Sequence, residues 1–367
     1  MHRLFSILTT GVLIVALAAS MSAQESAPLQ RLTADGFAVP QPGYAFSFPR
    51  DHGAHPDFRI EWWYVTGHLR ARDNRRFGVQ ATFFRNAAPD QSSDLHLAHV
   101  ALLDVATGTF LHQERLNRTG WDATASADGL DVRNGPWSLR MTDPASERME
   151  LRGGIRAEAA FTLDLAPGKP LVRFGENGLS RKGADPTSAS YYLTFPRIAA
   201  TGSLTVGAET LEVAGELWMD HEISSSQLSE GQVGWDWISV HLNDGREVML
   251  YRLRRRDGSA DPASILTWVD AQGKPQVAPF TWAVESTWTS ARTGAVYPAR
   301  VKVTTTDPAT GRGVDFTVEP LAASQELTGE LGGVPYWEGA CRVLDASGRE
   351  IGSAFMELTG YAKELKI

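Results

Sequence analysis

The stretch from 215 to 242, GELWMDHEISSSQLSEGQVGWDWISVHL, brings acids, histidines and indoles together. Read as a strand, it presents Glu216, Trp218, Asp220 and Glu222 on one face, because successive side chains of a strand alternate. Neighbouring carboxylates repel each other and burial raises their pKa, so one of them could stay protonated beside the indole. A protonated carboxyl in such a place can deliver a proton to an apolar substrate, and Asp220 is our candidate. The alternative is an exposed acidic strand end that leads into a serine-rich loop.

Short segments that read as strands follow one another from 61 to 361, with turn signals between them. The Asn243-Asp244-Gly245 turn is the clearest hairpin signal. Few stretches show helical periodicity. The pattern therefore predicts an all-β protein built from antiparallel barrels or sandwiches.

One segment occurs twice in similar form. EWWYVTGHL at 61–69 aligns without gaps on GWDWISVHL at 234–242. Both copies then turn and return as strands that end in aromatic residues and arginine, FFR at 83–85 and YRLRR at 251–255. The similarity predicts two related β units, the second of which begins near the central stretch, and a chance match is the alternative.

The two copies have an aromatic face in common. Alternation puts Trp62, Tyr64, Thr66 and His68 on one face of the first copy, and the matching face of the second copy is Trp235, Trp237, Ser239 and His241. Aromatic rings with a few hydrogen-bonding groups suit the wall of a ligand cavity, and they also suit a packed domain interface. We predict a cavity within or between the units, with Tyr192 in its wall and these ligand-binding residues: Trp62, Tyr64, Trp218, Trp235, Trp237 and His241.

Glu61 lies on the opposite face of the first copy, where a charge is costly unless it is paired. Arg59, Arg85 or Arg197 could supply the partner, and the structural ion pair that we predict is Glu61–Arg197. The preceding segment DHGAHPD at 51–57 invites a metal interpretation, but its spacing matches no zinc signature. We therefore predict no metal.

Composition and terminal pattern narrow the function classes. Arg3, an apolar run and small residues at 20–23 read as a secretion signal over 1–23, so we expect a periplasmic or secreted protein, with an uncleaved anchor as the alternative. The net charge of −8 argues against nucleic acid as a partner, and the single cysteine, Cys341, permits no intrachain disulfide. The sequence contains no Walker loop or dinucleotide fingerprint, so nothing calls for a nucleotide.

Several segments together resemble a known family. They are DHGAHPDFRIEWWYVTGHL, TFFR, YYLTFPRIAATGSLTV, GELWMDHEISSSQL and GWDWISVHL. In these the chain is similar, from about Phe46 to its C-terminus, to the AttH/CrtC-like proteins, which are lipocalin-like and include the carotenoid 1,2-hydratases (hydroxyneurosporene synthases). The resemblance implies two lipocalin-like antiparallel β-barrel domains packed together, at 46–222 and 223–367, after an irregular lead-in at 24–45.

The resemblance also implies a reaction. In the hydratases an acid within an aromatic-x-Asp-His segment is the proton donor, and Asp220 has that place here. We therefore expect acid-catalysed addition of water, or related lyase or isomerase chemistry, on a small apolar substrate such as an isoprenoid. Tyr192, His221 and Glu222 are expected to position or deprotonate the water, and no cofactor is needed. Trp218 stands where the hydratases have tyrosine, and Tyr191-Tyr192-Leu193 replaces their His-x-Trp.

Two other functions stay open at this point. An aromatic cavity without a working acid would suit a non-catalytic periplasmic carrier of a hydrophobic ligand. A secreted hydrolase would use Asp220, His221 and a serine from 224–226, although the sequence has no G-x-S-x-G elbow.

Overall fold

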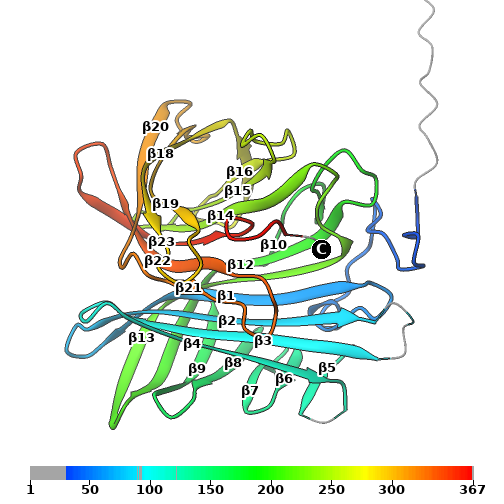
Figure 1. Cartoon of the computed structure of the whole chain (residues 1–367), viewed down its shortest axis with the longest axis horizontal. Coiled ribbons are helices and arrows are strands. Elements are labelled where there is room, and N and C mark those ends of the chain that lie inside the picture. The colour runs from blue at the N-terminus through cyan, green and yellow to red at the C-terminus, as the bar shows by residue number, and fades with distance from the viewer. Residues whose placement is uncertain (1–29, 89, 91–92, 121, 366–367) are drawn as a thin grey trace, which may run out of the picture.

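The computed structural model describes residues 30–88, 90, 93–120 and 122–365, and most of these lie in antiparallel strands. Within that part of the chain the strands form one sheet of 13 strands and one of 10, which curl into two barrel-like domains stacked on each other (Figure 1). A short 3-10 helix, η1 (Arg50–His52), precedes the first strand. No helix among these residues is long and apolar enough to cross a membrane. The predicted secretion signal lies outside the described residues.

The strands follow the chain in order, the first sheet being completed before the second begins. The first sheet contains β1 (Ile60–Ala71), β2 (Arg76–Ala87), β3 (Asp94–Asp104), β4 (Thr109–Arg118), β5 (Ala123–Ala125), β6 (Asp131–Asn134), β7 (Trp137–Asp143), β8 (Arg148–Ile155), β9 (Ala159–Pro167), β10 (Val172–Arg173), β11 (Leu179–Arg181), β12 (Ala189–Val206) and β13 (Glu209–Ser226). The second contains β14 (Gln232–Leu242), β15 (Glu247–Arg255), β16 (Ile265–Val269), β17 (Pro275–Ala278), β18 (Phe280–Thr289), β19 (Val296–Thr306), β20 (Gly313–Pro320), β21 (Glu326–Leu327), β22 (Tyr336–Leu344) and β23 (Glu350–Leu358).

The two sheets share the strand order around the repeated segment. The first begins β4-β3-β2-β1-β13-β12, and the second runs β17-β16-β15-β14-β23-β22. In each domain the first strand therefore pairs with the second and with the last. The predicted fold, two lipocalin-like antiparallel barrels packed together, is confirmed. The change of sheet comes between Ser226 and Gln232, so the boundary predicted after Glu222 falls inside β13.

Strands at the contact between the domains are buried on both faces, which is why they are rich in apolar residues. In β1, Trp63 and Val65 point into the core of the first barrel, whereas Tyr64 belongs to a separate cluster between the barrels. In β14, Ile238 points into the second barrel and Trp237 joins the same cluster between the barrels. The matching faces of the repeated segment thus meet at the domain interface.

The two histidines of the repeated segment make reciprocal contacts across that interface. His68 on β1 lies 2.9 Å from the Ala354 carbonyl oxygen of the second domain, and His241 on β14 lies 2.7 Å from the Pro196 carbonyl oxygen of the first. Burial lowers the pKa of His68 to about 4 and that of His241 to about 3, so both rings are neutral near pH 7 and donate an N–H to these carbonyl oxygens. His241, predicted to bind ligand, holds the domains together instead.

A buried ion pair network also joins the domains. Glu247 of β15 is fully buried, and its carboxylate lies 2.5 Å from the Lys169 ammonium and 2.6 Å from the Arg197 guanidinium, both from the first domain. Lys169 also donates to the carbonyl oxygens of Gly245 and Asp270, at 2.7 Å each. Removing one partner of a buried pair leaves an uncompensated charge, which costs more than losing an exposed pair.

We predict that Lys169→Met destabilises the protein by about 3 kcal/mol, because it strands part of the Glu247 charge at the interface. The measurement is urea unfolding followed by circular dichroism. Lys302→Met is the control, since Lys302 pairs with Asp315 at the surface and its loss should leave the midpoint unchanged. Equal midpoints for the two variants would contradict the role given to this network.

Candidate active site

A cavity of about 260 Å³ lies between the barrels, and both domains form its wall. Trp62 and Tyr64 of β1 face Trp235 and Trp237 of β14 around this space. Its size and its mostly apolar surface, rich in aromatic rings, suit one small apolar molecule. The Asp220 carboxyl of β13 is one of the ionisable groups in the wall.

Strand register brings Asp220 to the cavity. Its neighbours across the ladder are Tyr64 on β1 and Thr194 on β12, and directly opposite residues of antiparallel strands point to the same side. Thr194 donates a hydrogen bond of 2.5 Å to Oδ1, which also accepts one of 2.7 Å from the Trp218 indole. Tyr192 donates one of 2.7 Å to Oδ2. The carboxyl is therefore held in one orientation by three donors.

The Tyr192 hydroxyl has a fixed direction because of Trp237. An indole N–H can only donate, and that of Trp237 lies 2.9 Å from the Tyr192 oxygen. Tyr192 thus accepts a hydrogen bond from Trp237 of the second domain and donates its own O–H to Asp220 of the first. The orientation of the acid therefore depends on how the two barrels are packed.

Burial sets the charge of Asp220. Its side chain is 2% exposed, and desolvation raises its pKa to about 7. The hydrogen bonds from Thr194, Tyr192 and Trp218 favour the ionised form and act against this rise, while the neighbouring charge of Glu222 adds to it. Asp220 can therefore lose and regain a proton near neutral pH, as a general acid must.

Glu222 also lines the cavity, but it is paired. Its carboxylate lies 2.9 Å from the buried Lys182 ammonium and accepts a short hydrogen bond from Ser190. Burial acts to lower the pKa of Lys182, but attraction to Glu222 and Tyr251 outweighs it and raises the pKa, so the ammonium stays charged. Glu222 is therefore paired with a cation, whereas the donors that contact Asp220 are all neutral.

His221 lies on the other face of β13, away from the cavity. Its ring stacks on Trp63 inside the first barrel, and its Nε2 lies 2.9 Å from Glu61. Glu61 is fully buried and also receives the backbone N–H and Nδ1 of His55, at 2.9 and 2.8 Å. Asp220 and Glu61 therefore occupy opposite sides of one sheet, and His221, predicted as catalytic, contacts the structural cluster rather than the cavity.

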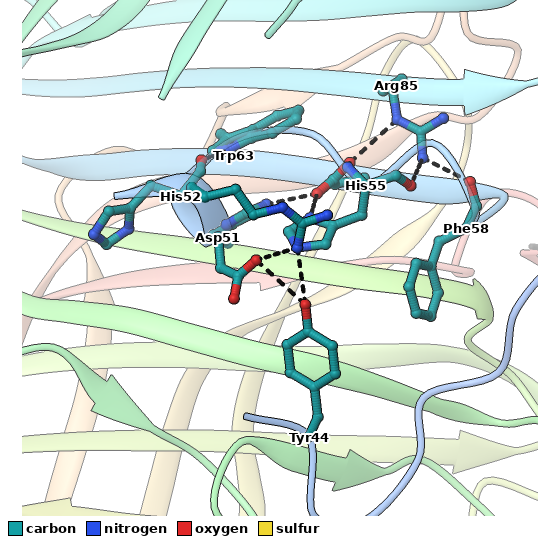
Figure 2. A network of polar contacts seen from close by, with 10 residues as sticks. Tyr44, Asp51, His52, His55, Phe58, Trp63 and Arg85 are labelled. Atoms are coloured by element: carbon teal, nitrogen blue, oxygen red, sulfur yellow. Dashed lines mark hydrogen bonds and ion pairs between the residues drawn. The ribbon is translucent and has the colours of Figure 1, made fainter. Parts of the chain in front are cut away.

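The ion pair predicted between Glu61 and Arg197 is not formed. Arg85, directly opposite on β2, places its Nε 3.1 Å from Glu61 and donates to the His55 and Phe58 carbonyl oxygens (Figure 2). Arg197 is instead engaged with Glu247 and Glu216. Register explains the difference, because alternation places Arg85 on the face that Glu61 occupies.

Trp218 and the serines that were expected in a loop have structural roles, and these serines belong to the end of β13. Trp218 is fully buried behind Asp220 and orients it through the indole N–H, without lining the cavity. Ser224 donates to the Ala189 carbonyl oxygen, and Ser225 donates to that of Ala38. Neither hydroxyl is placed as a nucleophile beside Asp220.

The group with metal-ligand spacing among the described residues is His55, Glu61 and His221, whose ligand atoms lie within 4.8 Å of one another. Both imidazoles point a nitrogen at the same Glu61 oxygen, and Arg85 lies on the other. Hydrogen bonds and the guanidinium therefore account for this arrangement without an ion.

Sequence reasoning missed several residues of the site, among them Lys182, Thr194, Tyr251 and Glu357. Thr194 follows Tyr192 by two positions, so strand alternation could have found it. Glu357 is an acid that directly follows the apolar run AFM at 354–356, a signal similar to the one that singled out Glu61. Lys182 and Tyr251 carry no such signal, because they reach the cavity only through the packing of the domains.

We predict that Asp220→Asn changes how stability depends on pH. In the wild type the folded state keeps the Asp220 proton up to about pH 7, whereas the unfolded chain loses it near 3.8, so stability falls as the pH rises between these values. The variant has no such proton to lose. The difference in the free energy of unfolding between variant and wild type should therefore shift in favour of the variant by on the order of 4 kcal/mol from pH 4 to pH 8. Urea unfolding at both pH values measures it. Asp164→Asn, at an exposed strand position, is the control, and a difference from the wild type that is independent of pH would contradict the burial argument.

Comparison with known proteins gives the family. The AttH-like family model matches residues 39–361. A candidate AttH from Nitrosomonas europaea is 38% identical over 89% of this chain and 99% of its own, with a TM-score of 0.79. Kievitone hydratase from Nectria haematococca shares the fold at 17% identity, over 91% of this chain and 96% of its own, with a TM-score of 0.65. CghA shares it at 11% identity, over 92% of this chain and 98% of its own, with a TM-score of 0.55. No curated protein sequence matched. The chain belongs to the AttH-like family.

Proposed function

We propose that this protein is a hydratase-type enzyme that adds water to a carbon–carbon double bond of a small apolar molecule, with Asp220 as the proton donor. The observation that carries the proposal is a buried carboxyl on the wall of an aromatic cavity, with its pKa raised by burial to about 7. Such a group is both protonated often enough and acidic enough to work at neutral pH. Kievitone hydratase is named as a hydratase, and its shared fold supports the same class of chemistry here.

The proposed reaction has two steps. The Asp220 carboxyl gives its proton to one alkene carbon, and the π electrons form the new C–H bond. The neighbouring carbon becomes cationic and is stabilised by the faces of Trp235 and Trp237, since aromatic rings attract cations. The oxygen of a water molecule then attacks that carbon, and the surplus proton passes to a base.

The charges in the wall favour a neutral substrate. Lys182 is the one lysine or arginine among the described lining residues, and Glu222 pairs with it. Among the described residues of the wall, no lysine or arginine is therefore free to bind a carboxylate or phosphate. The aromatic lining instead favours an unsaturated hydrocarbon skeleton, and an isoprenoid meets this description.

We predict that Asp220→Asn lowers the rate of water addition to acyclic terpenes by 10²-fold or more, because asparagine has the same shape but no proton to give. Gas chromatography of the alcohol product measures this rate. The exposed variant Asp164→Asn should keep wild-type turnover. Unchanged turnover by Asp220→Asn would refute the assignment.

A carrier of a hydrophobic ligand is the second candidate, because the cavity could hold a ligand without any acid. We predict that Trp235→Ala weakens binding of an acyclic terpene about tenfold, whereas Trp282→Ala, at a partly buried tryptophan outside the cavity, has no effect. Isothermal titration calorimetry measures both. Binding reduced by Trp235→Ala together with turnover that is insensitive to Asp220→Asn would identify a carrier.

A further inference from the structure

The second domain contributes an acid that matches Asp220. Glu357 on β23 lines the same cavity, and the Trp235 indole donates a hydrogen bond of 2.8 Å to its carboxylate. Glu357 lies directly opposite Trp237 on β14, as Asp220 lies opposite Tyr64 on β1. Trp237 and Tyr64 are themselves equivalent positions of the repeated segment, so Glu357 has the place in the second barrel that Asp220 has in the first.

The local sequence supports the same correspondence. GELWMD at 215–220 aligns without gaps on GSAFME at 352–357, with glycine and methionine identical, a large aromatic residue at the same position and an acid at the end. Both segments form the last long strand of their domain, paired with the strand of the repeated segment. The duplication therefore includes the acid as well as the barrel.

Buried polar groups of the neighbouring strands lie around Glu357. Glu338 is directly opposite it on β22 and is 1% exposed, and it is not among the described residues that line the cavity. The hydroxyls of Tyr64 and Tyr336 lie close to Glu338 and favour its ionised form, against the effect of burial. Tyr336 also bonds to His99 at 2.6 Å. Glu338 is therefore surrounded by protein groups, whereas Glu357 presents its carboxyl to the cavity.

Glu357 can change its charge near pH 7, whereas Glu338 and the two tyrosines close to it stay neutral. Burial raises its pKa to about 7, the Trp235 hydrogen bond acts against this, and the charge of Glu222 on β13 adds to it. Burial and the Glu357 charge raise the pKa of Glu338 much further, so Glu338 stays neutral. Burial likewise keeps the Tyr64 and Tyr336 hydroxyls protonated. The Lys182 ammonium forms its ion pair with Glu222, at 2.9 Å.

We propose that Glu357 is a second acid–base residue of the cavity, which binds the water that adds to the substrate and takes its proton. This inference rests on the proposed hydratase function and names the base that it requires. Asp220 and Glu357 come from different barrels, so the substrate lies between the proton donor and the proton acceptor.

The step balances with both residues in these roles. The Asp220 O–H bond breaks as the new C–H bond forms from the π electrons of the alkene. A lone pair of the water oxygen forms the C–O bond, and one water proton moves to the Glu357 carboxylate. After the alcohol leaves, Glu357 releases a proton to solvent and Asp220 takes one up, so the enzyme returns to its starting state.

The first test needs no substrate. In the wild type the indole N–H resonance of Trp235, followed by ¹H–¹⁵N NMR, should titrate with a midpoint near pH 7, because this N–H is bonded to Glu357. Glu357→Gln should abolish the titration while keeping the hydrogen bond. Glu338→Gln is the matched control, since a neutral acid is replaced by a neutral amide of the same shape, and the titration should persist. A Trp235 resonance that does not titrate in the wild type would overturn the inference.

The second test is the pH dependence of kcat/KM for acyclic terpene hydration. A base must be ionised and an acid protonated, so Glu357 should set the acidic limb and Asp220 the basic limb. Glu357→Gln should lower the rate 10²-fold or more and remove the acidic limb, while Glu338→Gln keeps both limbs and near wild-type activity. An acidic limb that survives in Glu357→Gln, with Asp220→Asn inactive, would overturn this inference alone. Full activity of Asp220→Asn would instead overturn the hydratase function.

Discussion

The hydrogen bond from Trp237 to Tyr192 crosses from one barrel to the other, and the Tyr192 hydroxyl in turn donates a hydrogen bond to Asp220. Because an indole can only donate, this chain of two bonds has one direction. A buried carboxyl needs such partners to remain in place without solvent. The contact between the barrels therefore forms the cavity and also orients its acid. Each barrel alone would lack half of this arrangement.

Strand β13 keeps two kinds of polar chemistry apart. On its inner face His221 contacts Glu61, where His55 and Arg85 bring further donors, and this cluster is satisfied by hydrogen bonds. Those contacts lower the pKa of Glu61 despite its burial, so it stays ionised. On the outer face burial prevails and the pKa of Asp220 rises. The two faces of β13 thus meet a fixed charge, on Glu61 of β1, and an exchangeable proton, on Asp220, because each face has a different set of donors.

Alternation along strands was the strongest guide that the sequence offered. It correctly grouped Trp62 with Tyr64 and Trp235 with Trp237, and it separated Glu61 from the cavity face. It could not choose between Arg85 and Arg197 as the partner of Glu61, because that choice depends on which strand lies beside β1. It placed His241 correctly on the interface face but could not tell interface from cavity. Contacts that form when two barrels pack, such as Lys182 with Glu222, leave no local pattern to read.

The duplicated architecture gives the cavity one titrating carboxyl from each barrel, and the account depends on the first of them, Asp220, keeping its proton up to about neutral pH. The most direct measurement is the ¹³C titration of the aspartate carboxyl carbons in selectively labelled protein, with the Asp220 signal assigned by its loss in Asp220→Asn. We predict that this signal titrates with a midpoint near pH 7. A midpoint near 4, or a carboxylate that stays ionised down to that pH, would contradict the account.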